Sequence, residues 1–291
     1  MAISADMVKK LREQTGAGMM DCKKALTETN GDYEKAVTLL REKGIAVAAK
    51  RETRAASEGL IGNCITPDAK TGVLVEVNCE TTFVAKTDEF VNLAQDLAKL
   101  VADTDTCGNL EVLLAKPFRN DQTVAECVSE IMGKVGEKMS VNRFVRLDTD
   151  GIIGSYIHMG SQIGVLVELT GASANDDTAQ LAKDLAMHIS WSSPEYLRRD
   201  EISEDALAKE RDVHRQWAVK EGKPENIIEK IVDGRMKDFF SKVCLMEQPY
   251  IKDEEQTIEK LVNSVSSKTG EKIAVGKYVR FRVGETTGDA E

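Results

Sequence analysis

The chain has 291 residues and a formal net charge of −10 at pH 7, with 42% hydrophobic and 30% charged residues, which is the composition of a globular protein rather than a fibrous or disordered one. It shows no apolar stretch of the roughly 18 residues that cross a membrane and no apolar signal-peptide core, so we expect a cytoplasmic protein that contacts no membrane. Residues 1–55 carry 11 Lys and Arg against 8 Asp and Glu, a weakly basic segment on an acidic body. This contrast fits a protein partner better than nucleic acid, with a plain solvated surface as the alternative.

The first 55 residues predict a small bundle of three helices. Apolar residues at helical spacing place these helices near Ala5–Gln14, Met20–Thr29 and Tyr33–Lys43. The stretch Thr15–Gly18 ends the first helix, Asn30-Gly31 caps the second, and Gly44 ends the third. So small a bundle has little core and is expected to dock rather than to do chemistry.

Met19 and Met20 lie in the expected turn between the first two helices. They are open to two interpretations: they close the core of the bundle, or they form an adaptable contact surface. The charged run Ala48–Gly59 is expected to be an extended helix or a linker to the body of the protein.

The body contains an internal repeat. Each copy reads as strand, strand, helix and late strand, which predicts a hairpin covered by an amphipathic helix and completed by a third strand. We therefore expect an α+β fold: an N-terminal module (1–55), then two related subdomains (56–149 and 150–291), each an antiparallel sheet with a helix. The matching segments are Gly59–Gly62 with Gly151–Gly154, Gly72–Val77 with Gly164–Leu169, Leu93–Ala98 with Leu181–Ala186, and Arg143–Leu147 with Lys277–Phe281.

Unequal distances between the matching segments locate two insertions. The second strands lie 92 residues apart, the helices 88 and the late strands 134. Copy one is therefore four residues longer between its second strand and its helix, where Glu80–Phe90 lies. Copy two is 46 residues longer between its helix and its late strand, from Pro194 to about Lys242.

The longer insertion predicts an antiparallel helical hairpin at about residues 199–240, with Gly222 and Pro224 in its turn. Its helices are expected at Ser203–Lys220 and Ile227–Phe240. Such a hairpin cannot bury both faces by itself, so self-association through it is a hypothesis. The expected apolar stripes are Ala206, Val213 and Trp217 on the first helix, and Ile228, Val232, Met236 and Phe239 on the second.

The sequence contains no phosphate-loop, dinucleotide, serine-hydrolase or zinc-protease motif. Its six cysteines are scattered without a C-x-x-C pair, which favours core residues in a reducing compartment. The histidines His158, His188 and His214 show no metal-ligand spacing. We expect His188 to be packed, whereas His158, in a glycine-rich hairpin loop, is open to a structural or a functional role. No enzyme activity, metal or cofactor is expected.

Four segments carry a family resemblance: Leu11–Leu26, Glu76–Lys86, Ser155–Val167 and Gly222–Phe239. In this order, and across almost the whole chain, they resemble the elongation factor Ts family. That family exchanges guanine nucleotide on elongation factor Tu, the GTPase that carries aminoacyl-tRNA to the ribosome. The resemblance implies a ubiquitin-associated-like N-terminal module that docks on the GTPase domain, a core that spans that domain and a β-barrel domain, and a dimerising helical hairpin of coiled-coil type. It implies no direct contact with nucleic acid.

The family's T-D-F-V motif, which intrudes near the magnesium site of the partner, matches Thr81, Thr82, Phe83 and Val84. Thr82 stands where the motif has aspartate, so a competing carboxylate is missing. We therefore expect Phe83 to act as a wedge that displaces the elements holding Mg²⁺, with its burial in the core of its own subdomain as the alternative. The asparagine that commonly follows the motif's lysine is Thr87 here.

The resemblance also implies that Met19, Met20, Lys23 and His158 contact the partner. Other members carry a further helical module after the last strand, and we expect no such module here. A competing class of function is an adaptor or chaperone that binds a GTPase through the three-helix module alone and leaves its nucleotide in place.

Overall fold

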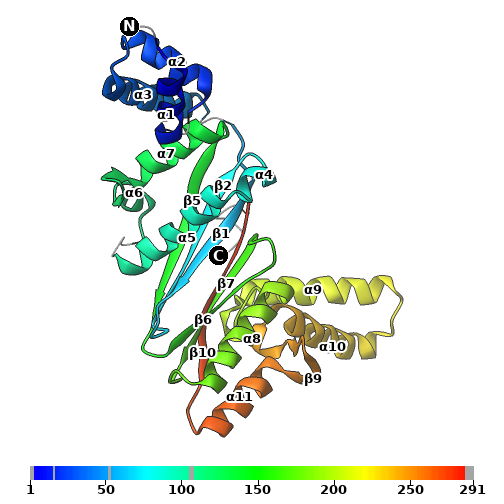
Figure 1. Cartoon of the computed structure of the whole chain (residues 1–291). Helices are drawn as coiled ribbons and strands as arrows, with labels where there is room; N and C mark the ends of the chain where they lie inside the picture. Colours follow the sequence, from blue (N-terminus) through cyan, green and yellow to red (C-terminus); the bar gives the residue numbers. More distant parts are fainter. Residues whose placement is uncertain (1–2, 16, 52–53, 105–107, 286–291) are drawn as a thin grey trace. The chain divides into compact units, whose positions relative to one another are not determined.

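The computed structural model describes residues 3–15, 17–51, 54–104 and 108–285, with the backbone alone for 44–51 (Figure 1). The chain separates into two compact units. One unit combines the residues up to Cys64 with Val75–Val145, and the other combines Ile65–Leu74 with the residues from Arg146 onward. Helices and small sheets occur together in both units, so the predicted α+β class is confirmed.

The first unit begins with three helices packed around a small apolar core, in which Leu11 and Leu26 are fully buried. Asn30 and Gly31 both take positive φ angles, 54° and 85°, and end the second helix as predicted. The helices and strands of this unit are α1 (Ala5–Thr15), α2 (Met19–Glu28), α3 (Tyr33–Arg51), β1 (Glu58–Ile65), β2 (Thr71–Cys79), α4 (Thr82–Ala85), α5 (Asp88–Asp103), α6 (Leu110–Leu114), β3 (Pro117–Arg119), β4 (Gln122–Thr123), α7 (Val124–Val135) and β5 (Met139–Asp148).

Helix α3 continues through Gly44 to Arg51, so the predicted end at Gly44 is wrong. A glycine inside a helix costs only about 1 kcal/mol relative to alanine, and alanine-rich sequence follows it here. Part of the predicted linker, Ala48–Arg51, therefore belongs to α3, while residues 52–53 of that linker lie outside the described residues. Helix α3 packs against α7, and Arg41 forms an ion pair of 3.0 Å with Glu126 there.

The first sheet has the strand order β1-β2-β5 and is covered by α5. Helix α5 buries Phe90, Leu93, Leu97 and Val101. Close approach of helix and sheet requires glycine, because a Cβ at Gly62 would lie 2.3 Å from the carbonyl oxygen of Ala94.

The second sheet has the corresponding order β6-β7-β10, read from its other edge, and its pairs are antiparallel. Gly154 repeats the role of Gly62, since a Cβ there would lie 2.4 Å from Cβ of Ala182 on α8. The elements of this unit are β6 (Ile152–Ile157), β7 (Ile163–Thr170), α8 (Asp176–Ser192), η1 (Arg199–Glu201), α9 (Glu204–Lys220), α10 (Glu225–Val243), η2 (Leu245–Glu247), β8 (Pro249–Tyr250), β9 (Asp253–Thr257), α11 (Ile258–Thr269) and β10 (Ala274–Arg282).

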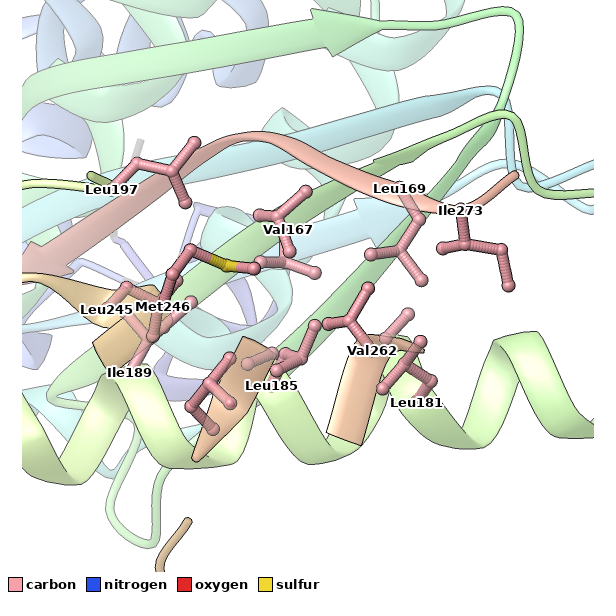
Figure 2. Packing of buried hydrophobic residues seen from close by; sticks show 14 of the residues in the cluster. Val167, Leu169, Leu181, Leu185, Ile189, Leu197, Leu245, Met246, Val262 and Ile273 are labelled. Atoms are coloured by element: carbon pink, nitrogen blue, oxygen red, sulfur yellow. The ribbon is translucent and has the colours of Figure 1, made fainter. Parts of the chain in front are cut away.

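Apolar side chains from β7, α8, α11 and η2 meet in the core of the second unit (Figure 2). Helix α8 lies along one face of the sheet and contacts both β6 and β7. The residues that Figure 2 labels in this core are Val167, Leu169, Leu181, Leu185, Ile189, Leu197, Leu245, Met246, Val262 and Ile273.

The repeat extends beyond the four pairs of matching sequence segments. A short strand pair followed by a helix precedes the late strand in both units: β3, β4 and α7 in the first, and β8, β9 and α11 in the second. Thr123 caps α7 and Thr257, 134 residues later, caps α11. Both helices end on a left-handed glycine, Gly136 or Gly270, that begins the tripeptide Gly-Glu-Lys. The strands of these pairs have two to five residues and are too short to show a periodicity in the sequence.

The inserted segment forms two helices, α9 and α10, that pack on one another. Ile228, Val232 and Met236 of α10 are buried, as predicted. The stripe predicted on α9 is wrong at Val213, which is 57% exposed, whereas Ala206 is half-buried and packs on an apolar cluster. The fully buried residue of α9 is Ala218. The side of α9 toward α10 combines Leu207, which packs on the apolar cluster, with arginines. Arg211 pairs with Glu229 and Asp233, Arg215 pairs with Glu229, and the small Ala218 packs with the buried residues of α10.

Candidate functional site

The four residues by which copy one exceeds copy two help to form a short helix, α4, between β2 and α5. Thr81 caps α4 through its hydroxyl, which accepts a bond from the amide of Val84. Thr87 caps α5 in the same way through the amide of Phe90. The backbone from Thr81 to Thr87 is therefore fixed by two capped helix N-termini within seven residues.

Phe83 projects from α4 with 84% of its surface exposed, while its neighbours Val84 and Ala85 are buried. The aromatic residue that fills the core beneath is Phe90, which is 1% exposed. The alternative that Phe83 closes the core of its own subdomain is therefore wrong. A large apolar side chain at such exposure contributes little to the core of this unit and is typical of a contact residue.

The start of α4 is held by a pair of carboxylates. Glu137 accepts two bonds from Thr81, one from its amide at 3.0 Å and one from its hydroxyl at 2.9 Å. Glu80 accepts a bond of 2.6 Å from the amide of Lys138. Sequence reasoning missed Glu137, which lies 56 residues from Thr81. Its only signal was the recurrence of Gly136-Glu137-Lys138 as Gly270-Glu271-Lys272.

Met19 and Met20 begin α2 instead of lying in a turn before it, and they are 54% and 64% exposed. The alternative that they close the core of the bundle is therefore wrong; Cys22 and Leu26 on the same helix do so. Lys23 is exposed one turn further along α2. The two methionines offer flexible apolar contact area beside a positive charge.

His158 lies at the tip of the hairpin between β6 and β7 and is exposed. Its amide donates to the carbonyl of Ile163 and its Nδ1 lies 3.3 Å from the hydroxyl of Tyr156. Met159 beside it is 88% exposed. The candidate residues thus occupy three separate elements: Thr81–Val84 are contiguous around α4, the methionines belong to α2, and His158 belongs to the second unit.

His188 is packed in the core of the second unit, as predicted, and is 1% exposed. Its Nδ1 accepts from the amide of Ile251, and its Nε2 lies 2.8 Å from Oε1 of Gln248. This pairing suits a neutral ring that donates through Nε2. Burial lowers the pKa of His188 below its ordinary value.

The lowered pKa of His188 makes stability depend on pH. The unfolded chain takes up the proton near pH 6.5 and the folded protein does not, so the contribution is intact above that pH. Below pH 6.5 the free energy of unfolding should fall by up to about 1.4 kcal/mol per pH unit until the folded pKa is reached. Urea denaturation at pH 7, 6 and 5.5 would show this loss, and His188→Gln should flatten it. His158→Gln is the matched exposed control and should keep the wild-type slope; equal slopes in all three proteins would contradict this assignment.

Of the described cysteines, all but the half-buried Cys64 are buried. Burial raises the pKa of the Cys79 thiol and of the Cys244 thiol to about 11, so both stay protonated at neutral pH. The Cys79 thiol donates to the carbonyl of Thr81 at 3.2 Å, which adds to the support of α4. Cys107 lies outside the described residues.

Within the described ranges, no group of three or more His, Cys, Asp and Glu side chains is arranged to hold a metal ion. A search of the same residues found no helix whose length and apolar character would let it cross a membrane.

Comparison with known proteins gives a consistent result. Residues 80–285 match the family model described as Elongation factor TS. Elongation factor Ts of Clostridium perfringens (strain SM101 / Type A) is 47% identical over 284 residues, which cover 97% of this chain and 93% of the relative. The proteins of the same name from Clostridium botulinum (strain Alaska E43 / Type E3) and Trichlorobacter lovleyi are 45% and 43% identical, with 97% and 98% of this chain covered and 93% and 94% of the relatives.

Proposed function

The chain belongs to the elongation factor Ts family, and on that premise we propose that it promotes the release of GDP from elongation factor Tu and holds the nucleotide-free GTPase until GTP binds. The observation that carries the mechanism is that Phe83 is exposed on α4. The first turn of this helix is capped by Thr81, which is bonded to Glu137. In this role the protein does no covalent chemistry, needs no cofactor, and works in the cytoplasm with other translation factors.

Thermodynamic linkage between nucleotide binding and factor binding limits how such a factor can act. A GTPase that holds GDP at nanomolar affinity has about 12 kcal/mol in that complex, much of it in phosphate and Mg²⁺ contacts. A factor with no nucleotide site can only bind the nucleotide-free state better than the loaded one. It then weakens nucleotide binding by the same free energy by which nucleotide weakens the binding of the factor.

We assign the differential contact to Thr81–Val84, with Phe83 as the wedge. A buried phenylalanine removes roughly 150–250 Å² from water and is the largest apolar group that α4 offers. Thr82 is exposed and neutral, so it carries no charge that could compete for Mg²⁺ directly. Displacement of the partner's elements that hold Mg²⁺ is the mechanism these side chains support.

The remaining parts take supporting roles in this proposal. The ubiquitin-associated-like module (1–55) docks through Met19, Met20 and Lys23, the first core subdomain (56–149) carries the wedge, and the second (150–291) contacts the partner through His158. The exposure of all four docking side chains supports this division.

Substitution of both methionines by serine should weaken binding to the GTPase about tenfold or more, because two flexible apolar contacts are lost. The maximal rate of GDP release at saturating factor should stay near that of wild type, because α4 is unchanged. A titration of the release rate against factor concentration separates the two quantities. Lys9→Ser, on the exposed side of α1, is the control. It should leave both the binding affinity and the maximal release rate unchanged.

We further propose that the helical hairpin, η1 to α10, mediates self-association. Val213 and Val219 are 57% and 59% exposed on α9, while the apolar line that the hairpin buries lies on α10. Size-exclusion chromatography with light scattering on a chain lacking residues 200–238 should show a smaller oligomer than the full chain. An unchanged oligomeric state would exclude the hairpin as the association surface.

One experiment separates the proposed exchange factor from an adaptor. Fluorescent GDP is released from preloaded elongation factor Tu with and without this protein. An exchange factor accelerates the release in proportion to its occupancy of the GTPase. An adaptor that docks through the three-helix module alone binds the GTPase and leaves the release rate unchanged.

A further inference from the structure

The segment that carries Phe83 is tied down by a clamp that joins three places in the first unit. These are the segment that precedes β1, the end of β2, and the turn between α7 and β5. Arg54 stands at the first place, Glu80 and Thr81 at the second, and Glu137 and Lys138 at the third.

The clamp is reciprocal. The carboxylate of Glu137 accepts from the amide and hydroxyl of Thr81, and the carboxylate of Glu80 accepts from the amide of Lys138. Arg54 closes the set, because its Nη1 donates to Glu80 at 3.2 Å and its carbonyl accepts from Nζ of Lys138 at 2.8 Å. Bonds to ionised groups are stronger than neutral ones, and these fix backbone atoms and not only side chains.

The internal repeat shows which part of the clamp is general. In the second unit Glu271 accepts from the amide and the hydroxyl of Ser173. Ser173 and Glu271 stand 92 and 134 residues after Thr81 and Glu137, so the same bond pair recurs at matching positions. The matching position of Glu80 is Ala172, which is buried and has no carboxylate. The reverse half of the clamp is therefore confined to the copy that carries α4.

Resting on the function proposed above, we infer that Glu137 is a positioning residue for nucleotide exchange: it fixes the first turn of α4 and thereby holds Phe83 ready to enter the partner. When the clamp holds α4, the helix is already ordered before Phe83 enters the partner. An unclamped α4 is competent only in the fraction of complexes where its first turn has formed, and the rate of release falls by that fraction.

The test compares Glu137→Ala with Glu271→Ala, which removes the matching bonds in the copy without α4. Two quantities are measured by fluorescent GDP release: the maximal rate at saturating factor and the factor concentration that gives half of it. Amide hydrogen exchange over residues 80–86 and 171–175 reports on the two loops. Glu137→Gln serves as a milder variant, since an amide oxygen still accepts one of the two bonds.

For Glu137→Ala we expect the maximal rate to fall at least about fivefold, with the half-saturating concentration changed less than about twofold, and faster amide exchange over 80–86. Glu137→Gln should lie between this variant and wild type. Glu271→Ala should speed amide exchange over 171–175 and leave the release rate unchanged. A merely unstable protein behaves differently: it loses active concentration, so its half-saturating concentration rises while its maximal rate is kept.

A wild-type maximal rate in Glu137→Ala, or an equal loss in Glu271→Ala, would overturn the role of Glu137. Phe83→Ala in the same assay separates this failure from that of the proposed function. If Phe83→Ala releases GDP at the wild-type rate, the wedge is wrong and Glu137 has no wedge to position. If Phe83→Ala is slow and Glu137→Ala is not, the wedge stands and the clamp is only structural.

Discussion

Phe83→Ala should slow catalysed GDP release tenfold or more, with the fold of the protein unchanged. A phenylalanine that moves from 84% exposure into a dry site on the partner removes roughly 150–250 Å² from water, which stabilises the complex by about 1.5–3 kcal/mol. Only the part of this free energy that is realised when nucleotide leaves affects the rate, and about 1.4 kcal/mol suffices for a tenfold change. Stopped-flow fluorescence at saturating factor measures it.

Two controls isolate the side chain of Phe83. Thermal unfolding should be the same for Phe83→Ala and wild type, because the ring contributes little to the core, whereas Phe90→Ala should lower stability strongly. Thr82→Asp, on the same turn of α4, should keep exchange intact or improve it, since it restores a carboxylate beside an unchanged wedge. A release rate for Phe83→Ala equal to wild type would refute the wedge mechanism.

The second large effect concerns stability. Glu76 on β2 is fully buried, and its Oε2 lies 2.7 Å from Nε of Arg143, whose side chain is 11% exposed on β5. Asn78 donates a further bond to Oε1 of Glu76. Arg143→Met removes the cation and leaves a buried carboxylate without it, which should cost about 3–5 kcal/mol of the free energy of unfolding. Urea denaturation followed by circular dichroism measures the loss.

The same strand supplies a matched control. Arg146 pairs with Asp148 through an ion pair of 3.0 Å, and both side chains are substantially exposed. Arg146→Met should therefore change stability by less than about 1 kcal/mol. The double variant Glu76→Gln with Arg143→Met should lose less than the sum of the two single changes, because neither charge is then buried alone. Additive losses would show that the pair itself contributes nothing.

Periodicity and repetition predicted most of the architecture. The recurrence of Gly72–Val77 as Gly164–Leu169 placed the central strands, and the spacing of Ile228, Val232 and Met236 placed the buried line of α10. These features are local patterns of apolar residues, and such patterns can be recognised in a sequence without knowledge of distant contacts.

What the sequence did not yield depends on long-range partners. The outward orientation of Val213 follows from arginines of α9 that pair with acids on α10, and nothing near Val213 signals it. The clamp joins residues 56 positions apart. For Phe83 the sequence left core and contact roles open, and the decisive fact is that Phe90 already fills the core. Extension of α3 through Gly44 reflects a small local penalty that neighbouring alanines offset.

The packing of α3 against α7, with Arg41 paired to Glu126, has a consequence for how the proposed partner is held. Met19 and Met20 of α2 and the proposed wedge on α4 belong to one compact unit. Once either has touched the partner, the other is presented at a high effective concentration, and its engagement costs little further loop-closure entropy. In the proposed mechanism, two modest contacts then act as one strong contact, and each detaches in turn when nucleotide returns.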